Sequence, residues 1–440
     1  MTATPRENAG NLRARALERM QQGDPVGAEL CFNQVLELVP DDVEALRFVA
    51  ASHLARGDAM RAVAMLLTAL EAQPEDPMTL HHLGSAQSQL GDWQGAAAHL
   101  RHCLRIAPGV FVARLRLGLA LEQLGDFHGA LVAYFAAVNT AQAQGRWMSD
   151  ATTAPGLRAA VRHAMAYIDG GRRQLFDAVL APLRERYGAA ELSRVEDCLA
   201  IYLGEKPAQW PDPRQQPKFL YFPGIPSQPY YPRERFPWLD ELESNTAAIR
   251  EELRAVLSEP EALESFLLTD SPQGAAELLR SSGPGAAAWD AYFFYRHGER
   301  YDAHAARCPR TAALLDSLPL ARVREHSPET LFSVLRPGSH ILPHRGVTNT
   351  RLVTHLPLIV PPDCALRVGG EIHAWREGHC VTFDDTFEHE AWNRSTQTRV
   401  VLILDVWNPD LSEAERGAVT SLVEAIGDFN RQCEVPLAAA

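Results

Sequence analysis

Leucine and alanine recur at helical spacing through the first third of the chain, with polar residues between them. The segments ALRFVAASHLARG and ARLRLGLALEQLG show this spacing clearly. Apolar residues that return every three or four positions form one stripe along a helix. The pattern therefore predicts amphipathic helices that pack against one another through these stripes.

A period of 34 residues organises these helices. Gly-Asp pairs begin at positions 23, 57, 91 and 125, an alanine follows each pair at a fixed offset, and proline stands at positions 40, 74 and 108. Gly-Asp suits a tight turn between paired helices, alanine allows close packing, and proline ends the second helix. The period and these residues resemble the tetratricopeptide repeat.

This resemblance predicts an all-α superhelix of repeats over residues 10–140. Its concave face suits an extended peptide or a helix, so we expect it to hold a peptide or protein substrate. An alternative is that the array serves only dimerisation or spacing, which leaves a homo-oligomer open. The repeat histidines are expected to be surface or packing residues: His81, His82, His102 and His128.

The pattern changes twice after the repeats. Residues 141–217 read as a helical bridge followed by a proline-rich linker, and a helical pattern returns in LDELESNTAAIREELRAVLSE. Short β-rich runs follow, namely TLFSVLRP, TRLVTHLPLIV, ALRVGG, EIHAWRE, HCVTFDD, HEAWN and RVVLILDVW. Such runs predict an antiparallel barrel or jelly roll within residues 218–412, and residues 413–440 read as a C-terminal helix and tail.

Charge and cysteine usage narrow the class of protein. The formal net charge of -13 argues against a broad phosphate-binding surface, so nucleic acid is not an expected partner. The seven cysteines are scattered, form no C-x-x-C pair and read as free thiols in a reducing compartment. The sequence shows neither a signal-peptide pattern nor a membrane-spanning apolar run, so we expect a cytoplasmic protein without a membrane partner.

Two histidines and one arginine in the β-rich region are candidates for chemistry. His344 and His389 each lie at a strand edge beside a turn, where neutral imidazoles could hold one face of an octahedral Fe(II) ion. Arg399 heads the apolar strand VVLILDVW, where a guanidinium needs a partner such as a dicarboxylate. The alternative is that the histidines only satisfy hydrogen bonds in the core.

Residues 218–412 resemble the aspartyl/asparaginyl β-hydroxylase family of 2-oxoglutarate dioxygenases. The resemblance is carried by ETLFSVLRPGSHILPHRGVTNTRLVTHLPLIVP and WREGHCVTFDDTFEHEAWNRSTQTRVVLILDVWNP. It implies a double-stranded β-helix (jelly-roll or cupin-like) domain with flanking helices that uses Fe(II), 2-oxoglutarate and O2. It also implies that His344 and His389 bind the iron, that Arg399 and Ser333 meet the distal carboxylate of 2-oxoglutarate, and that His355 lies beside the cosubstrate.

Two positions bear on this resemblance. The common facial triad has a carboxylate two residues after its first histidine, but Gly346 stands there, and the family shows the same lack. We expect Asp384 and Asp385 to have structural roles. The family's second basic residue corresponds to Val353. Arg351 is a candidate to compensate, because alternation along the strand places its side chain on the same face as those of Val353 and His355.

The resemblance implies hydroxylation of an unactivated carbon. Family precedent favours the β-carbon of an Asp or Asn residue in a polypeptide, although related bacterial enzymes act on lipid A acyl chains. The repeat array favours the peptide, because it would raise the local substrate concentration. One rival is a repeat-based scaffold with a degenerate dioxygenase-like domain, which Val353 favours. Another is a non-oxidative cupin that uses zinc.

Overall fold

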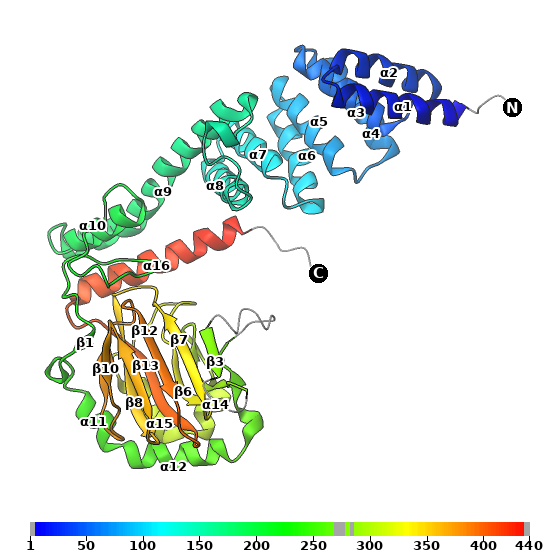
Figure 1. The fold of residues 1–440 in the computed structure, drawn as a ribbon. Helices are drawn as coiled ribbons and strands as arrows, with labels where there is room; N and C mark the ends of the chain where they lie inside the picture. The colour runs from blue at the N-terminus through cyan, green and yellow to red at the C-terminus, as the bar shows by residue number, and fades with distance from the viewer. Residues whose placement is uncertain (1–4, 268–277, 282–285, 435–440) are drawn as a thin grey trace. The chain divides into compact units, whose positions relative to one another are not determined.

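The computed structural model describes residues 5–267, 278–281 and 286–434 of the 440-residue chain (Figure 1). The chain divides into two compact units. Unit 1 comprises residues 1–174 and 429–440, and unit 2 comprises residues 175–428. The predicted domain boundaries at 140, 217 and 412 stay predictions, and the last part of the predicted tail, 435–440, lies outside the described residues.

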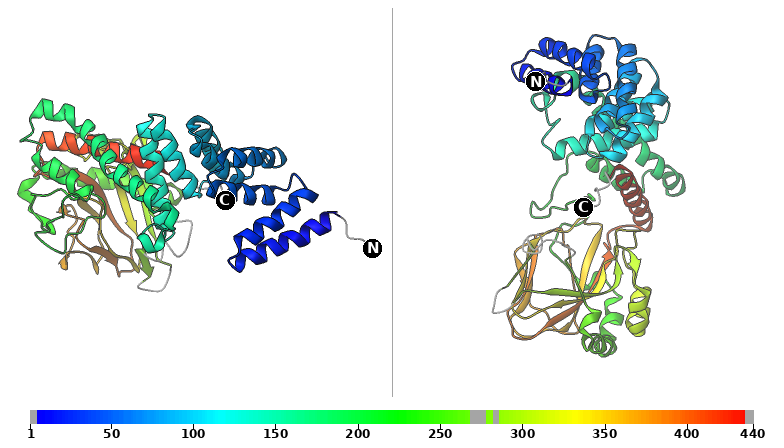
Figure 2. Two further views of the ribbon diagram at one scale, coloured as in Figure 1. Left: turned by 90° about the horizontal axis from the view of Figure 1, so that it is seen from above. Right: turned by 90° about the vertical axis from the view of Figure 1, so that its right-hand side faces the viewer.

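Eight helices form the repeat array of unit 1 and confirm the predicted all-α superhelix (Figures 1 and 2). They are α1 (Pro5–Gln21), α2 (Pro25–Leu38), α3 (Val43–Ala55), α4 (Ala59–Ala72), α5 (Pro77–Gln89), α6 (Trp93–Ile106), α7 (Phe111–Gln123) and α8 (Phe127–Ala143). Successive helices pack as antiparallel hairpins. Each hairpin exposes an apolar stripe that only the next hairpin can cover, so the units must stack.

The repeated Gly-Asp pair makes both the turn and the start of the second helix. Each glycine has a positive φ of 75° to 82°, which a residue with a Cβ rarely adopts. Each aspartate then accepts a backbone N–H at the N-terminus of the next helix, as Asp92 does from Gly95 at 2.9 Å. The alanine of each repeat is completely buried, as Ala96 is between α5 and α6. The sequence pattern therefore acts through capping as well as through the turn.

Three further helices lie outside the repeat array, and two of them, α9 and α16, are long. Helix α9 (Arg158–Tyr187) joins the segments GLRAAVRHAMAYI and RQLFDAVLAPLRERYG, which the sequence reading treated separately, and contains Pro182. Helix α10 (Ser193–Tyr202) and the C-terminal α16 (Glu413–Cys433) follow. Among the helices that the structure describes, none combines the length and apolar character needed to cross a membrane.

Unit 2 contains two antiparallel sheets. The eight-stranded sheet has the order β1-β11-β8-β13-β6-β4-β2, with β5 paired to β4. Its strands are β1 (Tyr230–Tyr231), β2 (Glu264–Ser265), β4 (Trp289–Arg296), β5 (Glu299–Arg300), β6 (Thr330–Leu335), β8 (Arg351–Ile359), β11 (Val381–Phe383) and β13 (Arg399–Trp407). The five-stranded sheet has the order β10-β9-β12-β7-β3. Its strands are β3 (Leu279–Ser281), β7 (Ser339–His344), β9 (Cys364–Val368), β10 (Glu371–His373) and β12 (His389–Asn393).

The two sheets face each other across a shared apolar core, which confirms the predicted jelly-roll architecture. Leu335, Val353 and Val401 of the larger sheet pack with Leu366 and Ala391 of the smaller one. Within the described part of the chain, the two sheets remain separate rather than closing into one barrel. The seven predicted β-rich runs are the strands β6 and β8 to β13. The prediction missed the other six described strands, of which β4 and β7 are the longest.

Four helices cover the outer face of the larger sheet (Figure 1). They are α11 (Leu239–Ser244), α12 (Thr246–Leu257), α14 (Asp302–Arg307) and α15 (Pro309–Ser317). Leu253 of α12 and Leu315 of α15 are completely buried against outward side chains such as Leu402. Because this face is sealed by apolar packing, the polar residues of the sheet can gather only on its inner face.

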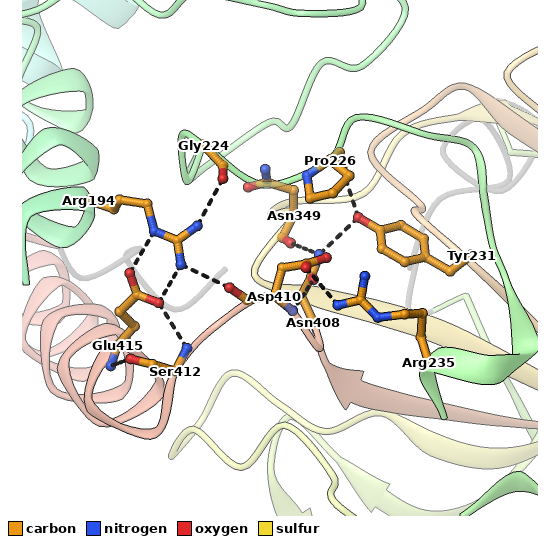
Figure 3. Close-up of polar contacts among 10 residues, drawn as sticks. All are labelled: Arg194, Gly224, Pro226, Tyr231, Arg235, Asn349, Asn408, Asp410, Ser412 and Glu415. Atoms are coloured by element: carbon orange, nitrogen blue, oxygen red, sulfur yellow. Dashed lines mark hydrogen bonds and ion pairs between the residues drawn. The ribbon is translucent and has the colours of Figure 1, made fainter. Parts of the chain in front are cut away.

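A partly buried ion pair fixes the start of α16 to α10 in unit 2 (Figure 3). Nε and Nη2 of Arg194 donate to the two carboxylate oxygens of Glu415 at 2.8 and 2.6 Å. Other Arg194 donors reach the carbonyl oxygens of Gly224 and Asp410 at 2.9 Å. The guanidinium thus connects α10 with the loop at Gly224, the loop at Asp410 and the start of α16. The Glu415 side chain is only 4% exposed.

Replacing Arg194 by alanine should destabilise unit 2 by about 3 kcal/mol, because it leaves the buried Glu415 carboxylate without its cation. Urea unfolding followed by tryptophan fluorescence measures the loss. The matched control is Arg307→Ala, which breaks the exposed pair with Glu259 and should cost less than about 1 kcal/mol. Equal losses in the two variants would contradict the role given to the Arg194 pair.

Candidate active site

A cavity of about 260 Å³ lies between the two sheets of unit 2. Every residue that the sequence analysis singled out for iron or cosubstrate lines it. They are Ser333, His344, Arg351, His355, His389 and Arg399. Strand alternation explains the convergence, because residues two apart on a strand share a face. On β13, Arg399, Ile403 and Asp405 line the cavity, while Leu402 packs against the outer helices.

His344 and His389 are direct partners across the antiparallel pair β7 and β12. Their ring centroids are 4.1 Å apart. Nδ1 of His344 lies 2.8 Å from the carbonyl oxygen of Leu342, and Nδ1 of His389 lies 3.1 Å from that of Phe387. If both Nδ1 atoms carry the proton that these carbonyls require, both Nε2 lone pairs remain available for a cation.

Burial keeps both imidazoles neutral. It lowers the pKa of His344, and burial together with the neighbouring His344 lowers the pKa of His389 to about 3. Neutral imidazole is the form that binds a metal. Among the described residues, no group of three or more histidine, cysteine, aspartate or glutamate side chains could hold a metal ion. A metal here would therefore rely on two histidines and on ligands from outside the protein.

Asp385 occupies the space beside Gly346. A Cβ added at position 346 would overlap the Asp385 carboxylate, and the Gly346 N–H donates to the Asp385 carbonyl oxygen at 2.7 Å. Oδ1 of Asp385 is buried and has no hydrogen-bond partner. Asp384 instead accepts hydrogen bonds from the Thr386 N–H and the Gln215 amide, which is the structural role expected of it. Asp385 differs because its side chain lines the cavity.

Arg399 is 1% exposed, and no acidic side chain pairs with it among the described residues. Nη1 makes two long hydrogen bonds to Ser333, of 3.3 Å to the hydroxyl and 3.4 Å to the carbonyl. The guanidinium lies over the Trp375 ring at 4.8 Å, and Nε is buried without a partner. Burial lowers the pKa of Arg399 to about 10, which leaves the group charged at neutral pH.

Unsatisfied polar atoms gather near Arg399. Nδ1 of His355 and Nε1 of Trp375 are buried and have no hydrogen-bond partner, and the two rings are 5.9 Å apart. Burial, reinforced by the charge of Arg399, holds the pKa of His355 well below its usual value. Buried polar groups normally have partners, so this cluster indicates that a polar ligand completes it.

Carboxylates line another part of the cavity, around Arg351. Nη1 of Arg351 lies 2.9 Å from Asp405 and 3.3 Å from Asp385. Burial alone would lower the pKa of Arg351, but Asp405, Asp385 and Glu329 outweigh it and raise the pKa. A contact between Arg351 and the cosubstrate stays a prediction, because these acids already hold the guanidinium.

Sequence reasoning missed two of the three acids around Arg351, namely Asp405 and Glu329. Asp405 interrupts the apolar run VVLILDVW just as Arg399 begins it, so the same argument about buried charge would have found it. Glu329 stands immediately before β6, where no pattern distinguishes it from a turn residue. Burial raises the pKa of Asp405 to about 6, and burial with the nearby Asp405 raises the pKa of Glu329 to about 7.

Replacing Glu329 by glutamine should raise the thermal unfolding midpoint more at pH 8 than at pH 5. The folded protein binds the Glu329 proton more tightly than the unfolded chain, whose pKa is near 4.5. Stability is therefore lost as the pH rises through about 7, and glutamine removes this loss. The exposed Glu251→Gln is the control and should show no such pH dependence. Equal shifts at both pH values for Glu329→Gln would contradict the prediction.

Comparisons with known proteins agree with this geometry. The family model described as aspartyl/asparaginyl beta-hydroxylase matches residues 243–409, and a tetratricopeptide repeat model matches residues 13–77, 50–111 and 81–145. The chain is 32% identical over 258 residues to the rat aspartate beta-hydroxylase domain-containing protein 2, which covers 57% of this chain and 71% of that protein.

Two further relatives are matched over smaller parts of this chain. The human aspartyl/asparaginyl beta-hydroxylase is 32% identical over 203 residues, which are 45% of this chain and 25% of that protein. The ornithine lipid ester-linked acyl 2-hydroxylase of Rhizobium tropici is 34% identical over 200 residues, 44% of this chain and 66% of that protein. The chain thus covers between 25% and 71% of the length of these three relatives. By the family model and these identities, the chain belongs to the aspartyl/asparaginyl β-hydroxylase family.

Proposed function

We propose that unit 2 is an Fe(II)- and 2-oxoglutarate-dependent dioxygenase that hydroxylates an unactivated carbon. The observation that carries the proposal is a single cavity with two different positions where a ligand could bind. It contains a cross-strand histidine pair whose Nε2 atoms are available when Nδ1 carries the proton, and a buried guanidinium that no acidic side chain of the described residues pairs with. The first fits a divalent cation, and the second fits a carboxylate.

The donor set fits Fe(II) rather than a closed structural zinc site. Structural zinc takes four protein ligands, whereas two imidazoles leave several octahedral positions free for a cosubstrate, O2 and water. When bound, the metal supplies the oxidative chemistry, in which 2-oxoglutarate and O2 yield succinate, CO2 and a hydroxylated product. His344 and His389 would hold the metal, each oriented by its own backbone carbonyl.

The remaining residues bind, orient and exclude water. Arg399 would take the distal carboxylate of 2-oxoglutarate, together with the Ser333 hydroxyl, which Trp289 Nε1 orients by a 2.9 Å hydrogen bond. His355 would offer its unpartnered Nδ1 to the cosubstrate. Asp385 would accept a hydrogen bond from water beside the histidines, since its Oδ1 lacks a partner. The apolar core between the sheets keeps bulk water from these groups.

The proposed substrate is the β-carbon of an Asp or Asn residue in a peptide or protein that the repeat array recruits. The family description and the name of the human relative support the residue type, and the repeats of unit 1 support a polypeptide. The Rhizobium relative is named for a lipid acyl chain, which is the alternative substrate. The repeat array favours the polypeptide because a binding groove in the same chain raises its effective concentration.

Val353 favours a second candidate function. Its apolar side chain lines the cavity where the family resemblance implies a basic residue. With Arg351 held by Asp405 and Asp385, no second cation in the described cavity is left free for the cosubstrate. In this reading the β-domain is catalytically degenerate and the repeat array is the working part.

Replacing His344 by alanine should weaken Fe(II) binding by more than about 100-fold, because even the loss of an outer-shell partner of a metal ligand costs about 10- to 100-fold. Anaerobic calorimetric titration of the full-length protein measures this. His340→Ala is the matched control, since His340 lies on the same strand but pairs with Glu390. Equal Fe(II) affinity in wild type and His344→Ala would overturn the assignment of the metal site.

Replacing Arg399 by methionine should weaken 2-oxoglutarate binding about 10- to 100-fold and leave Fe(II) binding unchanged. Methionine fills similar volume, and the site loses a buried charge rather than an ion pair, so the fold should persist. Succinate formed on admission of O2 measures turnover in wild type and variant. Succinate from wild type alone would support the dioxygenase. Fe(II) and cosubstrate binding without succinate would favour the degenerate reading.

A further inference from the structure

Trp375 covers the buried charge of Arg399 in the apolar core between the two sheets. It lies in the segment between β10 and β11, and its side chain packs in the same core cluster as Leu366 and Val381. The guanidinium carbon of Arg399 lies 4.8 Å from the centroid of the Trp375 ring. A cation over an aromatic ring is attracted by the electron-rich face, and the attraction grows where water is excluded. Because Trp375 is only 7% exposed, this contact is shielded from solvent.

The contact with Trp375 leaves the hydrogen-bond donors of Arg399 available. An ion pair with an acid uses the N–H groups in the guanidinium plane, whereas contact with a ring face does not require them. Nε of Arg399 has no partner, and Nη1 makes only the two long hydrogen bonds to Ser333. The ring thus stabilises the charge while these donors remain open to a carboxylate.

Arg351 lines the same cavity and has the opposite kind of partner. Its Nη1 lies 2.9 Å from Asp405 and 3.3 Å from Asp385, so acids neutralise its charge and take up a donor. No acidic side chain of the described residues does the same for Arg399. The two arginines therefore differ in what an anion would meet, and the difference follows from an aromatic ring in place of acids.

We propose that Trp375 is a positioning residue of the active-site cavity, which acts through Arg399 and keeps that cation free for a carboxylate ligand. The inference rests on the role of Arg399 in the proposed function. The ring stabilises the guanidinium charge, limits its rotation, and fills the space from which an acidic side chain could pair with it. The alternative is that Trp375 only packs in the core, so that the charge of Arg399 is indifferent to it.

Glutarate tests the proposal on the metal-free, full-length protein, because it carries both carboxylates of 2-oxoglutarate but lacks the oxo group. A ligand that binds the folded protein raises the thermal unfolding midpoint, and the concentration dependence of the rise gives its apparent affinity. Neither Fe(II) nor O2 takes part in this measurement. Glutarate binding that responds to Trp375 as expected, without succinate formation from 2-oxoglutarate, would contradict the dioxygenase proposal alone.

Trp375→Gln should weaken glutarate binding about 3- to 10-fold, because it removes the ring. Trp375→Glu should weaken it by at least about a further 10-fold, since its carboxylate can pair with Arg399 and occupy the donors. Trp375→Phe keeps a ring face and should lose less affinity than the glutamine variant. The glutamate variant should also unfold at a higher temperature than the glutamine variant, because the buried guanidinium then has an acidic partner.

The matched controls are Trp392→Gln and Trp392→Glu. Trp392 lies 4.8 Å from the guanidinium carbon of Arg394, which is exposed, and it does not line the cavity, so both controls should bind glutarate like the wild type.

Four results would each overturn the role of Trp375. They are no glutarate binding by the wild type, equal affinity in the wild type and Trp375→Glu, equal losses in the phenylalanine and glutamine variants, and a glutamate variant less stable than the glutamine variant. Where the polar variants do not fold, Trp375→Phe decides: a loss of affinity above about 10-fold would contradict a role of the ring face, and a smaller loss supports it.

Discussion

The buried guanidinium of Arg399 is the constraint around which unit 2 is organised. A charge removed from water costs several kcal/mol unless it is paired, and Arg399 is 1% exposed without an acidic partner among the described residues. The Trp375 ring and two long hydrogen bonds to Ser333 offset only part of that cost. The apolar helices behind the sheet stabilise the fold enough to tolerate the rest. An anionic ligand would remove the remaining free-energy cost of burying the Arg399 charge. Ligand binding and folding stability are therefore coupled through this side chain.

Charge within the cavity is divided between its parts. Around Arg351, the acids Glu329, Asp385 and Asp405 exceed the single cation, whereas Arg399 is a cation without an acid. An anion therefore meets attraction near Arg399 and, where the acids around Arg351 are ionised, repulsion near them. This division would orient a dicarboxylate by electrostatics before any close contact forms. The acids also hold Arg351 by hydrogen bonds from its guanidinium to Asp385 and Asp405. Arg351 therefore lines the cavity without being available to a ligand.

The sequence predicted the elements better than it predicted the contacts. The Gly-Asp period gave the helical hairpins, and the turn-bounded apolar runs gave most strands, because these signals are local in the chain. Strand β4 was missed although WDAYFFYR is rich in aromatic residues that favour strands. Arg399 was found because a charge in an apolar strand demands a partner. The raised pKa of Glu329 could not be read from the sequence, because it depends on burial and on Asp405, which is distant in the chain.

Gly346 and Asp385 show why the missing carboxylate of a facial triad cannot simply be restored in this fold. The two positions share one space, because a Cβ at 346 would overlap the Asp385 carboxylate. Position 346 is also tied to that strand end by its N–H bond to the Asp385 carbonyl oxygen. A side chain at 346 must therefore displace Asp385, which would release its contact with Arg351. Arg351 would then face Asp405 with one acid fewer, and the charge balance near the histidines would change. Gly346 and Asp385 therefore depend on each other. Because position 346 has no side chain, the carboxylate beside the histidines comes from the segment before β12 instead of from the end of β7.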